Sequence, residues 1–325
     1  MEREPLDGIE YESPTSSSRL HPPTDCGTIP QSMATARVLV LLSALCFGTT
    51  GTAQALGPHA SPAAVGAARV LVGGFLLVVV ARRFASRAAA PWSARAVLAG
   101  AAAVGGYQLT FFAAVHETGV EVGTVVALGS GPVFAGLLGR VVHYEPLTAR
   151  WWAATALAVA GVILLIAAGS AAHVRPGGVV LALGAGLCYA TYTVAAKGML
   201  AAGHSPEAVM ARIFGIGALG LFPVLIFNQP GDLASAGGLA LAIYLGAVPT
   251  ALAYVLFARG LRRLPAGEVA TLTLAEPLTA AALSAVILGE RPGVLALGGV
   301  ALVLAGLAAL AIPGRVRSRP LLVPS

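Results

Sequence analysis

Ten long apolar segments, joined by short polar connections, make up the chain from about residue 36 onward. They lie at about 36–56, 62–81, 95–115, 121–141, 149–169, 177–197, 206–227, 237–258, 267–289 and 294–313. Each is about as long as the roughly 20 residues that a helix needs to cross a bilayer. Backbone groups in lipid must be satisfied within the protein, so apolar runs that do not alternate predict helices. The sequence therefore predicts an all-α integral membrane protein with ten transmembrane helices.

Composition supports this prediction. Hydrophobic residues make up 57% of the 325 residues and charged residues only 10%, against about 25% charged in soluble domains. So few charges exclude a soluble enzyme, a nucleic-acid-binding module and a disordered chain. The three cysteines (Cys26, Cys46 and Cys188) have neither metal-site nor disulfide-framework spacing. We expect no metal, no cofactor and no nucleic-acid partner.

The two ends of the chain differ from the rest. Residues 1–34 are rich in Pro, Ser, Thr and acidic side chains, a composition typical of a disordered tail. Their acidic start does not resemble a signal peptide. Met33 directly precedes the first apolar run, so one hypothesis is that translation starts there. Residues 314–325 form the expected C-terminal tail.

The basic residues predict the orientation in the membrane. With the N-terminus in the cytoplasm, fifteen of them fall on inside segments and two, Arg175 and Arg291, on outside loops. The inside set is Arg37, Arg82, Arg83, Arg87, Arg95, Arg140, Arg150, Lys197, Arg212, Arg259, Arg262, Arg263, Arg315, Arg317 and Arg319. Cytoplasmic loops carry such an excess of Lys and Arg. We therefore expect a multi-pass inner-membrane protein with both termini in the cytoplasm.

The chain also repeats itself at a spacing of about 145 residues. Pro132 matches Pro277 and Gly161 matches Gly306 at that offset, as Glu145 matches Glu290. Near the start of each half, residues 44–48 (ALCFG) resemble residues 186–190 (GLCYA). Five spans per half is an odd number, so the two halves must cross the membrane in opposite senses. This predicts an inverted repeat, a common transporter architecture with its substrate site between the halves.

The repeated motifs resemble those of EamA-type transporters in the drug/metabolite transporter superfamily. The motifs run from Gly131-Pro132 to Glu145-Pro146 and from Glu276-Pro277 to Gly289-Glu290-Arg291-Pro292. The first copy has Tyr144 where the second has Gly289. The resemblance implies one five-helix repeat at 35–170, another at 176–313, cytoplasmic termini and alternating access. It further implies movement of small solutes, often export of amino acids or other metabolites.

Two charged residues within the spans are the main candidates for binding the solute. Glu276 lies near the middle of the ninth span and Arg69 within the second, where a charge costs about 2.5–3.5 kcal/mol on insertion scales. In one interpretation, Glu276 binds a substrate amine or carries a coupling proton. In the other, it is structural and bonds the backbone group that Pro277 leaves without a helix hydrogen bond. Arg69 either holds a substrate carboxylate, pairs with Glu276, or extends to the outer interface.

Further candidates are polar and aromatic side chains within the spans. Those expected to bind substrate are Tyr107, Gln108, Ser130, Tyr189, Tyr192 and Tyr254. The alternative is hydrogen bonding between helices, which is common in membranes. Pro132 and Pro277 each remove a helix hydrogen bond. They are interpreted as hinges for gating, or alternatively as fixed kinks.

Together these patterns predict a carrier, not an enzyme. We expect alternating-access transport, in the outward direction, of an amino acid, a related metabolite or a drug. Proton coupling through Glu276 is one hypothesis, and facilitated diffusion or exchange is equally compatible. The alternative function is an integral-membrane enzyme acting on a lipid-linked substrate. A receptor or assembly factor is a third possibility, although it would not require an inverted repeat.

Overall fold

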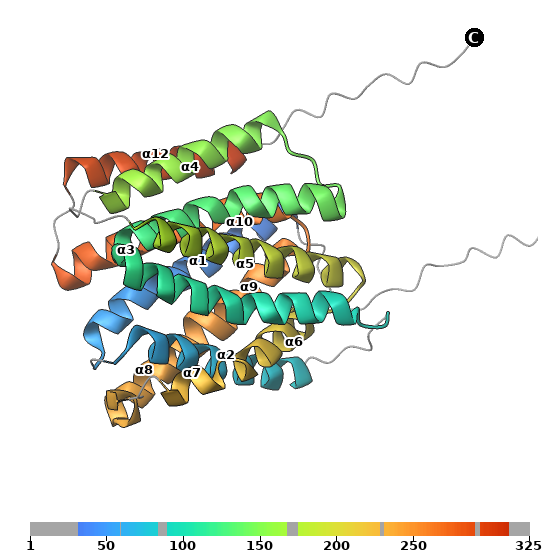
Figure 1. The fold of residues 1–325 in the computed structure, drawn as a ribbon. Coiled ribbons are helices and arrows are strands. Elements are labelled where there is room, and N and C mark those ends of the chain that lie inside the picture. Colours follow the sequence, from blue (N-terminus) through green and yellow to red (C-terminus); the bar gives the residue numbers. More distant parts are fainter. Residues whose placement is uncertain are drawn as a thin grey trace, which may run out of the picture. The chain divides into compact units, whose positions relative to one another are not determined.

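The computed structural model describes residues 32–58, 60–83, 90–167, 175–227, 231–289 and 293–311, all in the unit that begins at Ser32. These residues form helices and no strand (Figure 1). The helices are α1 (Met33–Leu56), α2 (Pro62–Arg83), α3 (Ala94–His143), α4 (Ala149–Ala167), α5 (Pro176–Ala201), α6 (Pro206–Leu219), α7 (Phe222–Phe227), η1 (Gly231–Ala234), α8 (Ala236–Gly246), η2 (Ala247–Leu252), α9 (Ala253–Leu261), α10 (Ala266–Leu272), α11 (Ala275–Leu283), η3 (Ser284–Leu288) and α12 (Val294–Ala311). The tails expected at 1–34 and 314–325 lie outside the described residues, except for residues 32–34.

The helical prediction is confirmed over the described part of every apolar run. Seven helical stretches in that part of the chain are long and apolar enough to cross a membrane. Two further runs form shorter apolar helices, at Ala149–Leu165 and Val294–Leu310. The run at 206–227 is divided between α6 and α7. Within the described residues there are thus seven helices of spanning length, where the sequence predicts ten over the whole chain.

Glycine and proline explain where the helices break. Gly119 has φ 81° and ψ 160° and separates Ala94–Gly119 from Val122–His143 within α3, a conformation that side chains other than glycine rarely adopt. Gly220 and Leu221 separate α6 from α7, just before Pro223. Proline has no N–H and disfavours helical backbone in the residue before it. A Gly or a Pro therefore lies at each break.

Two further prolines lie where the helices line the interior. Pro249 lies in η2, a π-helical turn between α8 and α9, and Thr250 Oγ1 donates to the Leu245 carbonyl at 2.8 Å. In an α-helix the Leu245 carbonyl would accept the N–H of residue 249, but proline has no N–H to donate. Pro277 is the third residue of α11, after a break between α10 and α11, where the Glu276 N–H donates to Thr273 O at 2.9 Å. By contrast, α3 continues as a helix through Pro132.

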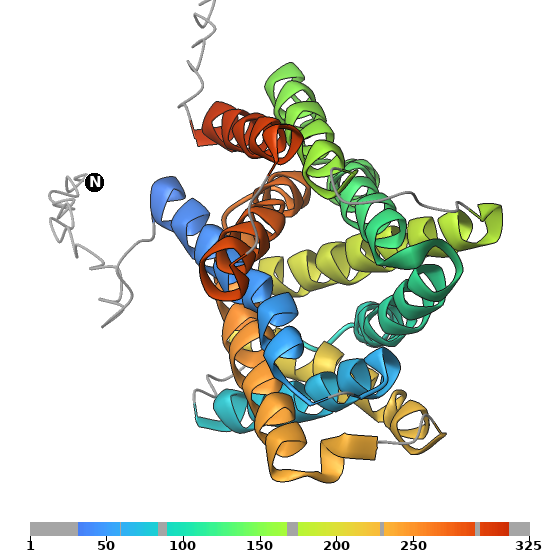
Figure 2. The ribbon, with the colours of Figure 1, turned by 90° about the vertical axis from the view of Figure 1, so that its left-hand side faces the viewer.

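Helices α4 and α12 lie side by side (Figures 1 and 2). They pack through a pair of glycine contacts. A Cβ added to Gly161 would lie 2.6 Å from the backbone N of Val303. A Cβ added to Gly306 would lie 2.6 Å from the carbonyl of Ala154. Backbones approach this closely in membranes where the residues are small. The glycines therefore set the spacing between the two helices.

We expect Gly161→Ala to lower the stability of the α4–α12 pair. The added methyl group would meet backbone atoms, and overpacking of this kind costs about 1–3 kcal/mol. The measurement is the thermal unfolding midpoint of the detergent-solubilised protein. Gly298→Ala is the matched control, since a Cβ at Gly298 on α12 meets nothing within 4 Å. Equal midpoints for the two variants would contradict a tight contact at Gly161.

Charged contacts concentrate at the end of the bundle where α1 begins and α10 begins. Arg37 of α1 pairs with Glu268 of α10 at 2.8 Å, and Glu145 accepts the Ala266 N–H at 2.7 Å. Lys197 donates to two carbonyls between α9 and α10, each at 2.8 Å. A carboxylate at a helix N-terminus is favoured by the unsatisfied N–H groups there. These contacts tie α1, α3 and α5 to the start of α10.

Candidate functional site

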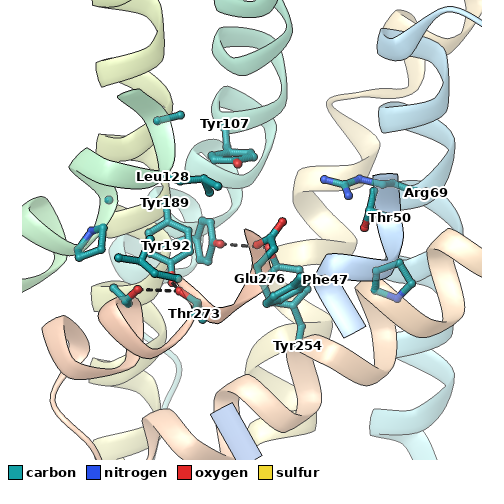
Figure 3. A pocket seen from close by; sticks show the side chains of 16 residues that line it. Phe47, Thr50, Arg69, Tyr107, Leu128, Tyr189, Tyr192, Tyr254, Thr273 and Glu276 are labelled. Carbon is teal, nitrogen blue, oxygen red and sulfur yellow. Dashed lines mark hydrogen bonds between the residues drawn. The ribbon is translucent and has the colours of Figure 1, made fainter. Parts of the chain in front are cut away.

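A central cavity lies among α1, α2, α3, α5, η2, α9, α10 and α11 (Figure 3). It offers about 60 Å³ to the centre of a water-sized sphere, several times the roughly 10–15 Å³ that one buried water needs. Its lining consists of Phe47, Thr50, Arg69, Tyr107, Ala127, Leu128, Gly131, Pro132, Tyr189, Tyr192, Pro249, Tyr254, Ala270, Thr273, Leu274 and Glu276. The cavity therefore combines aromatic walls with one acid and one base.

Glu276 lies in the first turn of α11, and its carboxylate faces this cavity (Figure 3). Helix α1 packs against the same turn, because a Cβ on Gly48 would lie only 2.8 Å from the Glu276 carbonyl. Among the described residues the structure gives this carboxylate neither a hydrogen bond nor an ion pair. A carboxylate without a protein partner in a membrane interior is costly. Its charge is thus available for a ligand in the cavity.

Arg69 reaches the cavity from α2, on the opposite side from Tyr189 (Figure 3). Its Nη2 donates to Gln108 Oε1 at 3.4 Å, and Gln108 Nε2 donates to the Gly66 carbonyl at 3.0 Å. Gln108 is 3% exposed, so its amide is fixed by packing as well as by this bond. The ion pairs in the described part of the chain do not join Arg69 to Glu276. The arginine is therefore held by Gln108, and its other N–H groups remain for a ligand.

Tyrosine hydroxyl groups provide the neutral polar atoms of the cavity. Thr273 donates to the Ala270 carbonyl at 2.8 Å, so Tyr189 acts as donor in its 3.0 Å bond to the Thr273 hydroxyl. Tyr192 and Tyr254 bond through their hydroxyl oxygens at 3.1 Å. Two hydroxyl groups hold two hydrogens and this bond uses one. The Tyr192–Tyr254 pair can therefore donate one more hydrogen bond.

The aromatic rings that line the cavity also pack against one another and hold one another in place. Tyr254 contacts Phe47 with ring centroids 5.0 Å apart and Phe214 at 4.0 Å. Tyr189 and Tyr192 meet edge to face at 5.3 Å. These separations lie near the range that favours aromatic pairs. The apolar part of a bound solute would contact preformed ring surfaces.

The structure brings together most of the residues that the sequence singled out. Glu276, Arg69, Tyr107, Tyr189, Tyr192, Tyr254 and Pro132 line the central cavity. Gln108 lies in a smaller adjoining cavity, behind Arg69. Pro277 faces a different hollow, described below. Whether any of these residues binds a solute remains a prediction.

Ser130 does not line the central cavity. Its hydroxyl donates to the Ala127 carbonyl at 3.3 Å, within α3. It also faces Gly186 of α5, where an added Cβ would collide with Ser130 Oγ and lie 3.0 Å from the Ala127 carbonyl. The side chain is therefore part of the close contact between α3 and α5. Position within a span did not reveal which side of the helix faces the cavity.

Several residues of the lining were not predicted as site residues, among them Phe47 and Thr273. Phe47 carried a usable signal, because it matches Tyr189 in the repeated segments 44–48 and 186–190. Thr273 lies three residues before Glu276, but only the break between α10 and α11 turns it toward Tyr189. Threonine is common in membrane spans as a helix-bonding residue, so composition alone did not mark Thr273.

The cavity suits a molecule with separated charges and does not suit a metal. Within the described residues, no group of three or more His, Cys, Asp or Glu side chains could hold a metal ion. One carboxylate and one guanidinium can bind an ammonium and a carboxylate of the same solute. The surrounding rings can cover its apolar part. The charges and ring surfaces of the cavity could therefore complement a small zwitterion.

A family model described as the EamA-like transporter family matches the chain twice, at residues 35–167 and 176–312. Relatives of known sequence agree with this match. The chain is 40% identical over 271 residues to the uncharacterized transporter YwfM of Bacillus subtilis, covering 83% of this chain and 91% of that protein. It is 30% identical over 265 residues to the threonine/homoserine exporter RhtA of Escherichia coli K12, covering 78% and 83%.

A third relative and one solved structure extend the comparison. The chain is 32% identical over 213 residues to a probable terminal-alkyne amino-acid exporter of Streptantibioticus cattleyicolor, covering 64% of this chain and 70% of that protein. A solved structure described only as the crystal structure of a protein superposes with a TM-score of 0.76. It covers 86% of this chain and 99% of its own, at 19% identity. At that identity the likeness shows the fold alone.

Proposed function

We propose that this chain, which belongs to the EamA-like transporter family, exports a small zwitterionic amino acid across the inner membrane. The observation that carries the proposal is the central cavity. It holds an acid, Glu276, and a base, Arg69, that do not pair with each other in the described structure. An α-amino acid presents an ammonium and a carboxylate that complement these two groups.

The aromatic walls add a preference for side-chain type. Tyr107, Tyr189, Tyr192 and Tyr254 surround the space between Glu276 and the apolar lining. A second charge on the solute would have no described partner there. We therefore propose that the solute has an uncharged side chain of small or medium size. The names of two relatives, a threonine/homoserine exporter and a probable terminal-alkyne amino-acid exporter, support this class.

We propose further that ten helices form two inverted repeats, at 35–170 and 176–313. The contacts of α4 and α12 support this arrangement, because they are reciprocal. Gly161 approaches Gly299 and Val303, while Gly306 approaches Ala154 and Ala158. Adding 145 to 154, 158 and 161 gives 299, 303 and 306. A two-fold relation between two copies produces such reciprocity.

Alternating access requires the cavity to open to one side at a time. The ionic contacts around Glu145, Arg37 and Glu268 lie at the end of the bundle where α1 begins. The excess of basic residues assigns that end to the cytoplasm. We therefore propose that this structure is closed toward the cytoplasm. Pro132, which lines the cavity, and Pro277, beside the break before α11, are the proposed hinges.

Coupling to protons is proposed through Glu276. A carboxyl group that faces the cavity without a protein partner can exchange a proton for the solute's ammonium group, since both neutralise the same charge. Uniport would use the same residue only for binding. Proton-coupled transport and uniport differ in whether an imposed proton gradient drives accumulation of the solute. Relatives that are transporters, and the unpaired acid and base, favour a carrier over a membrane enzyme.

The direct test is transport by the purified protein in proteoliposomes. Vesicles are loaded with threonine, threonine amide or N-acetylthreonine, which are a zwitterion, a cation and an anion of similar shape. We expect release of threonine well above that from protein-free vesicles, with little release of the other two. Repeating the measurement with an outwardly or inwardly directed proton gradient tests coupling. Release of the amide as fast as threonine would overturn a site for zwitterions.

A further inference from the structure

A second hollow lies beside the central cavity, toward the end of the bundle where α1 ends. It offers about 500 Å³ to the centre of a water-sized sphere. We call it the outer hollow; it is lined by Gly51, Thr52, Thr124, Leu128, Leu165, Glu276, Pro277, Ala280, Ala281, Ser284, Ala285, Leu288 and Ala296. These residues come from α1, α3, α4, α11, η3 and α12. Most are small or carry hydroxyl groups.

Two residues, Leu128 and Glu276, line both spaces. The spaces are therefore adjacent, and Glu276 borders both. Arg69 lines the central cavity and not the outer hollow. A solute in the outer hollow thus meets the acid of the site without its base.

We propose that the outer hollow is a second binding site for the transported solute, which there keeps its ammonium group on Glu276 and has released its carboxylate from Arg69. This proposal rests on the proposed function and assigns a chemical class to the hollow: a small primary ammonium compound. The remaining lining provides the hydroxyl groups of Thr52 and Thr124. These can bond a solvated carboxylate without binding it as tightly as a guanidinium does.

The geometry makes Glu276 a pivot for release. The solute first spans Glu276 and Arg69 in the central cavity. It then turns about its ammonium group into the wider hollow, where one strong contact replaces two. A hydrogen bond to an ionised group is about twice as strong as one between neutral groups. Losing the contact with Arg69 therefore weakens binding before the solute leaves, which favours its departure toward the end where α1 ends.

A lipid chain is the competing occupant of such a hollow. The carboxylate of Glu276 argues against it, because an acyl chain would bury that charge without a partner. The wall also carries hydroxyl groups, on Thr52 and Thr124, beside its apolar residues. A hydrated ammonium solute can pair with the Glu276 charge and bond the hydroxyl groups of the wall. Water access is therefore the property that separates the two occupants.

The experiment measures thiol accessibility in a chain without its own cysteines (Cys26→Ser, Cys46→Ala and Cys188→Ala). Ala281→Cys places a thiol in the outer hollow, and Ala282→Cys places one on the exposed side of the same helix, outside it. Membrane-impermeant methanethiosulfonates, one cationic and one anionic, are added from the outside of right-side-out vesicles. We expect the cationic reagent to modify Cys at 281 at least fivefold faster than Cys at 282, and faster than the anionic reagent does.

The same vesicles test which ligand occupies the hollow. Threonine and threonine amide should each slow modification at 281, while N-acetylthreonine should not, because only the first two present an ammonium to Glu276. Glu276→Gln in this background should remove the protection and the preference for the cationic reagent. No modification from outside, equal modification at 282, or protection by N-acetylthreonine alone would each overturn the proposal. This readout needs no transport, so it can succeed even if threonine is not carried.

A second variant tests whether release passes through the hollow. Ala281→Leu would fill part of the space next to Ala280 and Ser284 without touching the central cavity. We expect the maximal rate of threonine release to fall about tenfold, while the thermal unfolding midpoint stays close to that of the unmodified protein. Ala282→Leu is the matched control. Unchanged release by the Ala281→Leu protein would rule out the hollow as the route.

Discussion

Threonine transport by a Glu276→Gln protein is expected to fall about 10- to 100-fold. Glutamine keeps the size of the side chain and removes the charge that faces the cavity. The ammonium of the solute then loses a charge-assisted bond of about 1.5–3 kcal/mol. The measurement is the initial rate of release from proteoliposomes over a range of internal threonine concentrations. If Glu276 also carries the coupling proton, the pH dependence of transport should disappear in the same variant.

Glu117→Gln is the matched control for this loss of charge. Glu117 is a carboxylate on α3, partly exposed and 3.8 Å from an exposed Arg175, where a surface ion pair contributes little. We expect transport close to that of the unmodified protein. A Glu276→Gln protein that keeps both its rate and its pH dependence would contradict a direct role for this carboxylate in binding and in coupling. Folded yield and thermal midpoint of each variant separate a lost site from a lost fold.

The second large effect is expected at Arg69. Arg69→Lys keeps the positive charge and loses the planar fork that binds a carboxylate through two bonds. It also loses the geometry that Gln108 fixes at 3.4 Å. We expect threonine to bind about 10- to 100-fold more weakly, while binding of threonine amide changes little. The measurement is equilibrium binding of both ligands to the purified protein.

The comparison of ligands distinguishes recognition from general damage. A damaged protein would lose both ligands, whereas loss of a carboxylate contact affects threonine alone. Arg140→Lys is the control, since Arg140 is exposed at the end of α3. Equal weakening of threonine and its amide by Arg69→Lys would show that the guanidinium does not contact the carboxylate. Arg69 would then be a structural residue held by Gln108.

Much of the fold follows from the sequence because membrane spans are constrained physically. Apolar length and the need to satisfy the backbone predict the helices, and these positions are helical in the described residues. The breaks were harder to predict. The sequence places Pro223 and Pro249 inside apolar runs, and only the structure shows that the first lies in the first turn of α7, just after a break, and the second in a π-helical turn. A proline in a span can do either, depending on which neighbour satisfies the freed carbonyl.

The candidate site followed from scarcity of charge. Glu276 and Arg69 were singled out because charges within spans are rare and costly, and the structure places both at one cavity. Ser130 was chosen by polarity alone and faces α5 instead. The orientation of a residue about its helix axis depends on which neighbours the helix packs against. A single sequence with weak amphipathic contrast does not determine those neighbours.

The reciprocal contact between α4 and α12 has a consequence for the origin of the chain. A surface that binds its own copy in this way is isologous, which is the kind of interface found in symmetric dimers. A polypeptide of half this length would then carry the whole contact by itself. One substitution in such an ancestor would change the interface in two places at once. In a single chain that holds two such copies, Gly161 and Gly306 can change independently, and position 276 and its counterpart Gly131 already differ.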